Sequence, residues 1–167
     1  LGNVGSFTEN KNQRYLIELM EELLLHNLSY KLILVGNGET KERLEKYVVQ
    51  KGISDNVFFA GIRSEIPEFM HLFDIFLFPS KLEGLGIVAV EAQACKCKCI
   101  LSDTIPREVD LKLGNVRYMP LENKDEWIEA IKSMNKSERV NIDPSKIKAS
   151  VFNIENTVRQ LEKVYQL

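Results

Sequence analysis

Apolar residues along this chain fall into short runs that alternate with longer amphipathic stretches. The short runs are typical of strands, and some of them, such as Ile75 to Phe78, are apolar at every position. The predicted strands are Asn3 to Phe7, Lys31 to Val35, Val57 to Ala60, Ile75 to Phe78, Cys99 to Leu101 and Val116 to Met119. Strands that are apolar on both faces predict a parallel sheet covered by helices on both sides.

The longer stretches carry apolar residues three or four positions apart, which indicates amphipathic helices. The predicted helices are Asn12 to His26, Glu39 to Lys51, Ile66 to Phe73, Ile87 to Cys95, Lys124 to Met134 and Asn153 to Tyr165. In the last of these, Val158, Leu161 and Val164 recur at the spacing of a stripe that faces the core. A polar loop is expected from Asn135 to Pro144. The alternation of strand and helix predicts one α/β domain over residues 1–167.

Composition and charge exclude several classes of function. The chain carries 22 Lys and Arg against 24 Asp and Glu, a formal net charge of −2, so its charge does not point to nucleic acid. No apolar run approaches the roughly 18 residues of a membrane helix. The N-terminus lacks a basic region followed by an apolar stretch, so no signal peptide is expected and a cytoplasmic location is favoured. Because the chain lacks an initiating Met, we interpret it as a piece of a longer protein.

The three cysteines, Cys95, Cys97 and Cys99, alternate along one short segment. An odd number with no partner elsewhere argues against a disulfide framework. A metal site is the functional alternative, but the spacing is not Cys-x2-Cys and no histidine is near. We therefore expect buried, unbridged thiols in a reducing cytoplasm and no metal.

The segment from Phe78 to Ala94, FPSKLEGLGIVAVEAQA, carries most of the candidate chemistry. Gly84 and Gly86 stand between a strand and a helix, where glycine lets the backbone approach a ligand. The first turn of the helix leaves N–H groups unpaired and carries a partial positive charge, which suits a phosphate. Such loops occur in many α/β folds, so this one is not specific by itself.

Two carboxylates make the segment more informative. Glu91 lies in a helix that is apolar almost all round, so it is expected to be buried and to need hydrogen-bond donors. The vicinal hydroxyls of a ribose would supply them, while pairing with an arginine or capping a neighbouring loop is the structural alternative. Glu83, on the loop, would accept from sugar hydroxyls or else be solvated. Hydrolysis by the two carboxylates is disfavoured because nothing marks a second wall around a glycoside.

Seven residues separate Glu83 from Glu91. The segment that contains this pair resembles the signature of the family 4 retaining glycosyltransferases. Other segments match in the family's order and spacing, namely VGSFTENKN (4–12), LILVGNGE (32–39), VFFAGIRSEI (57–66), DIFLFPS (74–80) and ILSDTIPREV (100–109). The resemblance covers nearly the whole chain and is greatest to bacterial exopolysaccharide and capsule transferases. It implies a Rossmann-like parallel sheet sandwiched by helices, the C-terminal, donor-binding half of a GT-B fold whose N-terminal acceptor domain is absent.

The resemblance also implies roles for individual residues. Glu91 would bind the ribose, Glu83 would contact hydroxyls of the transferred sugar, and Lys11 would neutralise the departing diphosphate. Taken alone, Lys11 is an ordinary surface lysine. Further donor-binding positions are Leu85, Gly86, Ile87, Val88, Gly61, Ile62, Arg63, Ser6 and Gly36.

Apart from Ser6, these further positions are of three kinds. The amides of residues 85–88 would face the sugar and the distal phosphate. The loop of residues 61–63 would lie by the nucleobase, with Arg63 either stacked on the base or solvated. Gly36 and Gly38 would open space beside the ligand or only shape a turn.

The chain departs from the family at two places. Ser6 stands where the family usually has an arginine beside the lysine, so one cation is missing from the leaving-group site. Arg14 and Arg107 are the candidates to replace it. The run Cys95-Lys96-Cys97-Lys98 stands where the family favours glycine and proline, which is expected to alter turn geometry more than chemistry.

The expected function is binding of a nucleoside-diphosphate sugar, UDP-linked, for retaining hexosyl transfer to a glycan or lipid-linked acceptor. The fragment alone is expected to be inactive, and no metal or other cofactor is expected. Peripheral association of the full-length protein with the inner face of the membrane is left open. The alternatives are half of a nucleotide-sugar epimerase, which would need further acid–base residues, and a non-catalytic, degenerate transferase module, which Ser6 favours.

Overall fold

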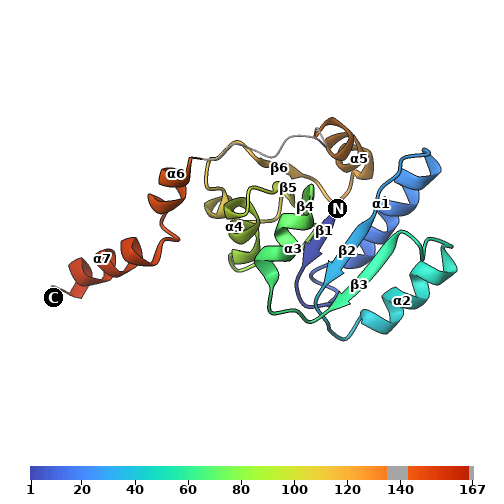
Figure 1. The fold of residues 1–167 in the computed structure, drawn as a ribbon, viewed down its shortest axis with the longest axis horizontal. Helices are drawn as coiled ribbons and strands as arrows, with labels where there is room; N and C mark the ends of the chain where they lie inside the picture. The colour runs from blue at the N-terminus through green and yellow to red at the C-terminus, as the bar shows by residue number, and fades with distance from the viewer. Residues whose placement is uncertain (135–142, 166–167) are drawn as a thin grey trace.

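The computed structural model describes residues 1–134 and 143–165, and one six-stranded sheet forms the centre of the domain (Figure 1). Its strands are β1 Gly2–Val4, β2 Leu32–Val35, β3 Val57–Gly61, β4 Ile75–Phe78, β5 Lys98–Ser102 and β6 Val116–Met119. Every neighbouring pair of strands is parallel, which confirms the predicted sheet. β1 ends earlier than predicted because Phe7, although apolar, is buried in the loop that follows the strand.

Helices cover both faces of this sheet. They are α1 Gln13–Leu25, α2 Lys41–Gln50, α3 Ile66–Leu72, α4 Ile87–Ala94 and α5 Lys124–Ser133. Two separate cores result, with α1, α2 and α5 packed on one face and α3 and α4 on the other. β4 shows why its sequence is apolar throughout, because Ile75 and Leu77 enter the first core while Phe76 and Phe78 enter the second. The sandwiched α/β architecture is therefore confirmed.

The order of the strands, β3-β2-β1-β4-β5-β6, reverses direction between β1 and β4. From β1 the chain moves outward to β2 and β3, and from β4 it moves the other way to β5 and β6. The loops after β1 and β4 therefore run apart and leave a crevice at the carboxyl ends of the two strands. Parallel sheets bind ligands at this kind of position.

The end of the chain differs from the prediction. A short helix that was not predicted, α6 Pro144–Lys148, is capped by the Asp143 side chain, which accepts from the Ser145 amide at 2.9 Å. A 3-10 turn at Arg107–Val109 was also missed. Both are too short for a periodic pattern to reveal. Residues 135–142, most of the predicted polar loop, lie outside the described residues.

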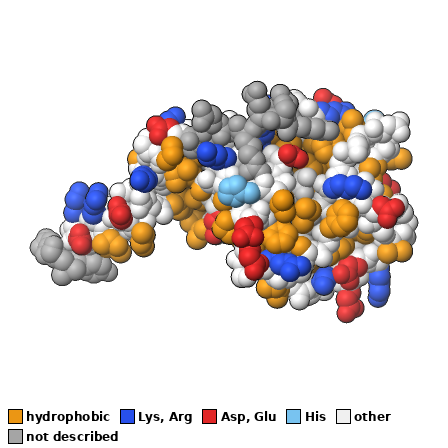
Figure 2. Space-filling model, viewed as in Figure 1, with side chains coloured by type: hydrophobic (Ala, Val, Ile, Leu, Met, Phe, Trp, Pro, Cys, Tyr) orange, Lys and Arg blue, Asp and Glu red, His pale blue; other side chains and the backbone are white. Residues whose placement is uncertain are grey.

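The last helix, α7 Ile154–Tyr165, was predicted as a helix, but its position relative to the core differs from the prediction. It extends away from the domain, and apolar side chains lie on the surface of this extension (Figures 1 and 2). Val158 and Leu161 are 43% and 50% exposed, so the prediction that they face the core is wrong. Periodicity specifies an apolar face of a helix without specifying what packs against it. The Val164 side chain lies outside the described residues.

The cysteines were expected to be buried and unbridged, and Cys95 departs from this expectation in its burial. Cys97 and Cys99 are buried, Cys95 is half-buried, and none of them forms a disulfide. Burial raises the pKa of the Cys99 thiol well above its ordinary value, since a thiolate would lose its hydration. Within residues 1–134 and 143–165, no three His, Cys, Asp or Glu side chains are grouped as metal ligands. Over the same residues, no helix combines the length and the apolar character needed to cross a membrane.

Gly36 holds the loop after β2 against the loop after β1. Its φ is +136°, and a Cβ at this position would lie 1.9 Å from the Gly5 carbonyl oxygen. Its amide donates to the Gly61 carbonyl at 2.8 Å. The structure thus places Gly36 at a close backbone approach, which supports a role in shaping the turn, and a role of Gly36 beside a ligand stays a prediction.

Replacing Gly36 with alanine should therefore be costly. We expect Gly36→Ala to lower the free energy of unfolding by about 3 kcal/mol, because the new Cβ overlaps the Gly5 backbone in a conformation that alanine avoids. Gly52→Ala is the matched control, since Gly52 also has a positive φ (+67°) but a Cβ there meets no atom within 4 Å. Its cost should be about 1 kcal/mol. Urea unfolding followed by circular dichroism measures both variants, and equal losses would contradict the packing role of Gly36.

Candidate functional site

A cavity of about 500 Å³ opens at the crevice between β1 and β4. Three segments form its walls: the loop after β1, the loop after β4, and the first turns of α4. Its lining residues are Val4, Gly5, Ser6, Lys11, Glu83, Leu85, Gly86, Ile87, Val88 and Glu91. The structure thus brings together all the site residues that were predicted on these three segments.

The start of α4 supplies hydrogen-bond donors to this cavity. Gly86 precedes the helix with a φ of +87°, and a Cβ there would lie 3.1 Å from the Phe78 ring. The first bond of the helix is donated by the Ala89 amide to the Gly86 carbonyl at 2.9 Å. None of the amides of residues 85–88 donates a hydrogen bond within the described part of the chain. Unpaired amides at a helix N-terminus favour an anion, because the helix dipole adds to their partial charges.

Lys11 and Glu83 meet inside the cavity. Lys11 Nζ lies 2.6 Å from Glu83 Oε1, and the two side chains are 22% and 11% exposed. The same carboxylate oxygen accepts a hydrogen bond from Ser80 Oγ. Ser6 lies nearby with an exposed side chain, and its carbonyl accepts from Gln13 Nε2 at 3.0 Å. Lys11 is the one cation among the lining residues.

Two asparagines tie the loop after β1 to the loop after β4. Asn10 Nδ2 donates to the Leu82 carbonyl at 2.8 Å, and the Lys81 amide donates back to the Asn10 carbonyl at 2.8 Å. Asn12 Nδ2 donates to the Pro79 carbonyl at 3.2 Å. These bonds fix the loop that carries Glu83 relative to the loop that carries Lys11.

Ser80 anchors the loop after β4 from its other side. Its side chain is fully buried, and its carbonyl accepts from Ser102 Oγ at 2.5 Å and from Thr104 Oγ1 at 2.7 Å. Both donors belong to β5 or to the turn that follows it. Sequence reasoning missed these residues and the two asparagines, because common loop residues carry no mark of what they bond across the fold.

Glu91 lies on an exposed edge of α4, so the prediction that it is buried is wrong. The helix covers the sheet with Ala89, Val90 and Ala92, whereas Ile87 and Glu91, one turn apart, face outward. Within the described residues the Glu91 side chain has no hydrogen bond or ion pair, so neither an arginine partner nor a capped loop is found. A solvated carboxylate on the cavity wall is available to a ligand.

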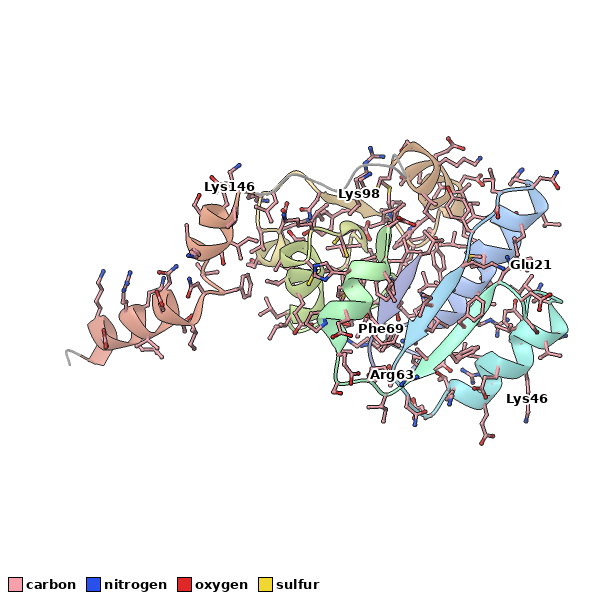
Figure 3. All side chains as sticks on the ribbon, in the orientation of Figure 1. Glu21, Lys46, Arg63, Phe69, Lys98 and Lys146 are labelled. Carbon is pink, nitrogen blue, oxygen red and sulfur yellow. The ribbon has the colours of Figure 1, made fainter. Side chains whose placement is uncertain are left out.

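The loop after β3 does not line this cavity. Arg63 Nε donates to the Ala60 carbonyl at 2.8 Å, and its guanidinium lies 5.9 Å from the centre of the Phe69 ring (Figure 3). Ile62 is 78% exposed. Gly61, Ile62 and Arg63 are not among the lining residues, so their contact with a nucleobase stays a prediction.

The two arginines considered as replacements for the missing cation are engaged elsewhere. Arg14 Nε lies 3.1 Å from Glu18 Oε1, and its guanidinium lies 4.5 Å from the Tyr47 ring centre. The Arg107 guanidinium lies 3.6 Å from the ring centre of Tyr118. Neither arginine lines the cavity.

The fold agrees with the comparisons to known proteins. Residues 1–148 match the model of the family "Glycosyl transferases group 1", so the chain belongs to that family of enzymes. It is 38% identical over 132 residues to the putative glycosyltransferase EpsF of Bacillus subtilis, covering 78% of this chain and 34% of that protein. It is 25% identical to an Escherichia coli enzyme named as a UDP-Gal:alpha-D-GlcNAc-diphosphoundecaprenol alpha-1,3-galactosyltransferase, covering 98% of this chain and 43% of that protein.

Solved structures of other proteins have the same fold. The Anabaena protein HepE in complex with UDP superimposes with a TM-score of 0.77 at 20% identity, covering 99% of this chain and 48% of that one. TarM superimposes with a TM-score of 0.82 at 21% identity, covering 99% and 34% of the two chains. The chain therefore has the Rossmann-like fold of one half of a GT-B glycosyltransferase, and it spans less than half the length of these proteins.

The asparagine contacts lead to a test by proteolysis. Lys81 is exposed and directly precedes Leu82, whose carbonyl accepts from Asn10 Nδ2. We expect Asn10→Ala to speed tryptic cleavage after Lys81 by about fivefold to tenfold, because one net hydrogen bond contributes about 1 kcal/mol to local opening. Mass spectrometry of timed digests measures the rate.

Asn56→Ala is the control for this test. Asn56 Nδ2 donates to the Tyr30 carbonyl at 3.0 Å at the amino ends of the strands, far from the Lys81 loop. This variant should leave the cleavage rate after Lys81 unchanged. The clamp would be refuted by equal rates in wild-type and Asn10→Ala protein.

Proposed function

We propose that this chain binds the nucleoside-diphosphate sugar, with UDP as the nucleotide, from which the intact protein transfers a hexose with retention to a glycan or lipid-linked acceptor. The observation that carries the proposal is the composition of the cavity. It combines the unpaired amides at the start of α4, one lysine and two carboxylates at the switch point of a parallel sheet. These groups match the parts of such a donor, taken one by one.

The diphosphate would lie against the start of α4. The amides of residues 85–88 and the Lys11 ammonium belong to residues that line the cavity and can donate to a diphosphate. Fixed donors of this kind stabilise charge without reorganising during the reaction. We propose that they neutralise the diphosphate directly, with no metal ion as intermediary.

The two carboxylates would recognise the hydroxyl groups at the two ends of the donor. Glu91, one turn into α4 and solvated, would accept from the vicinal hydroxyls of the ribose. Glu83, on the loop before α4, would accept from hydroxyls of the transferred sugar. The loop of residues 61–63 would take the nucleobase, beyond the cavity that the other residues line.

In the reaction, the bond between the anomeric carbon and the phosphate oxygen breaks, and its electron pair stays on the phosphate. Lys11 and the amides of α4 would stabilise this charge. The acceptor hydroxyl oxygen would bond to the anomeric carbon on the face that the phosphate leaves. Its proton would pass to the departing phosphate oxygen, so no protein nucleophile is required.

Three similar proteins support the choice of donor and acceptor. A similar E. coli enzyme is named for a UDP-linked galactose and a diphosphoundecaprenol-linked acceptor, and a similar Anabaena structure contains UDP. A relative that is 26% identical is the capsular polysaccharide biosynthesis glycosyltransferase CapH of Staphylococcus aureus. We place the acceptor site in parts of the full-length protein outside these 167 residues.

One observation favours a second candidate, a non-catalytic module that binds a nucleotide sugar. Ser6 contributes no cation, and Arg14 and Arg107 are engaged elsewhere, so Lys11 would be the one cationic side chain of the cavity beside the leaving group. Transfer of labelled sugar by the full-length protein separates the two candidates. Donor binding without any transfer would favour the module.

The donor site is tested by calorimetry with UDP. Wild-type chain should bind UDP, and Glu91→Ala should weaken the affinity about tenfold or more, because hydrogen bonds to a charged group contribute about 1.5–3 kcal/mol. Glu129→Ala is the control, since Glu129 is an exposed helical glutamate (71%) on α5, outside the cavity. Absence of binding at millimolar UDP would overturn the donor site. Equal affinity in wild type and Glu91→Ala would overturn the ribose contact.

A further inference from the structure

Two of the three charged groups that line the cavity, Lys11 and Glu83, form an ion pair before any ligand arrives. Lys11 Nζ lies 2.6 Å from Glu83 Oε1 in a partly buried pair. It also lies 5.1 Å from the centre of the Phe78 ring, whose apolar surface limits the water around it. The cation proposed for the diphosphate is therefore already occupied by the carboxylate proposed for the sugar.

Glu83 is the fixed partner of this pair. Its Oε1 accepts from Ser80 Oγ, and Ser80 is fully buried and anchored through its carbonyl by Ser102 and Thr104. Lys11, by contrast, reaches the carboxylate through a flexible four-carbon stem. In the described part of the chain both contacts of Glu83 fall on Oε1, so Oε2 is the oxygen left for a ligand.

A diphosphate in the cavity changes the balance of this pair. The diphosphate and the Glu83 carboxylate would then compete for the Lys11 ammonium. If the diphosphate takes the ammonium, Glu83 needs another hydrogen-bond donor. An intact nucleoside-diphosphate sugar supplies these hydrogen-bond donors itself, because its sugar hydroxyls reach Glu83 when its diphosphate reaches Lys11. Free UDP brings the diphosphate alone, and leaves Glu83 as an anion beside it.

We infer that the Lys11–Glu83 pair couples sugar recognition to diphosphate binding, so that the site binds the intact donor in preference to the nucleoside diphosphate that transfer releases. This inference rests on the proposed function. It makes Glu83 a residue that sets specificity between substrate and product, in addition to its contact with the sugar.

The test is calorimetry of the 167-residue chain with UDP, UDP-glucose, UDP-galactose and UDP-N-acetylglucosamine. For wild type, the best UDP-sugar should bind more tightly than UDP. Glu83→Gln keeps the size of the side chain and an oxygen for Ser80, but it cannot hold Lys11 as an ion pair. We expect it to bind UDP about three- to fivefold more tightly, the range of a partly exposed ion pair, and to gain nothing for the UDP-sugar.

Glu91→Gln is the matched control. It removes the same charge from the same cavity, but Glu91 does not touch Lys11. Because the ribose is common to both ligands, this variant should weaken UDP and UDP-sugar alike and leave the ratio of their dissociation constants unchanged. In a Lys11→Met background, Glu83→Gln should no longer tighten UDP binding appreciably. This result would attribute the tightening to loss of the Lys11–Glu83 ion pair, and not to loss of repulsion between Glu83 and the diphosphate.

The outcomes distinguish the inference from the proposed function. A wild-type chain that binds none of the four ligands would overturn both. UDP binding with no tightening in Glu83→Gln, or equal tightening for UDP-sugar, would overturn the inference alone. Should Glu83→Gln fail to fold by circular dichroism, Glu83→Ala serves instead, with the same expected gain for UDP and a loss for the UDP-sugar.

Discussion

The reversal of strand order between β1 and β4 is the constraint on which the site depends. Successive strands of a parallel sheet are joined by crossover connections. The connections after β1 and β4 leave in opposite directions, so neither covers the crevice between these two strands. The two buried cores hold β1 and β4 side by side. The hydrogen bonds of the sheet do not hold the loops beyond its edge. Those loops are held by side-chain hydrogen bonds from Asn10, Asn12, Ser102 and Thr104.

The electrostatics of the cavity follow from this arrangement. One lysine and two glutamates line it, so its formal charge is +1 − 2 = −1. A cavity of that charge does not attract a diphosphate by its overall field. Binding of an anion there depends on the direction of the amides at the start of α4 and on where the lysine is held. The ability of the site to bind an anion therefore depends more on the positions of the loops than on the net charge of the lining residues.

The fold was predictable because its physical cause is local in the sequence. A strand buried on both faces has to be apolar at every position, and β4 is a clear case. The segment from Glu83 to Glu91 was also predictable, since glycines between a strand and a helix mark the carboxyl edge of the sheet.

Other features depend on partners that are distant in sequence, and these were missed or misjudged. Glu91 was expected to be buried because α4 is apolar almost all round, but a helix at the rim of a cavity leaves one edge uncovered. α7 shows the same limit, since its apolar stripe has no partner within the described domain. The Ser80 anchor joins residues that lie 22 and 24 positions apart, beyond the reach of any local pattern.

The burial of the cysteines has a practical consequence for spectroscopy. Cys97 and Cys99 are enclosed in the core beneath α4, so a thiol-reactive dye meets Cys95 first. Cys95 caps the end of α4, and its amide donates to the Glu91 carbonyl at 3.0 Å. A fluorophore attached there would sit one helical turn from the cavity wall in the unmutated chain. Its emission would report on occupancy of the cavity in real time, without a radioactive sugar.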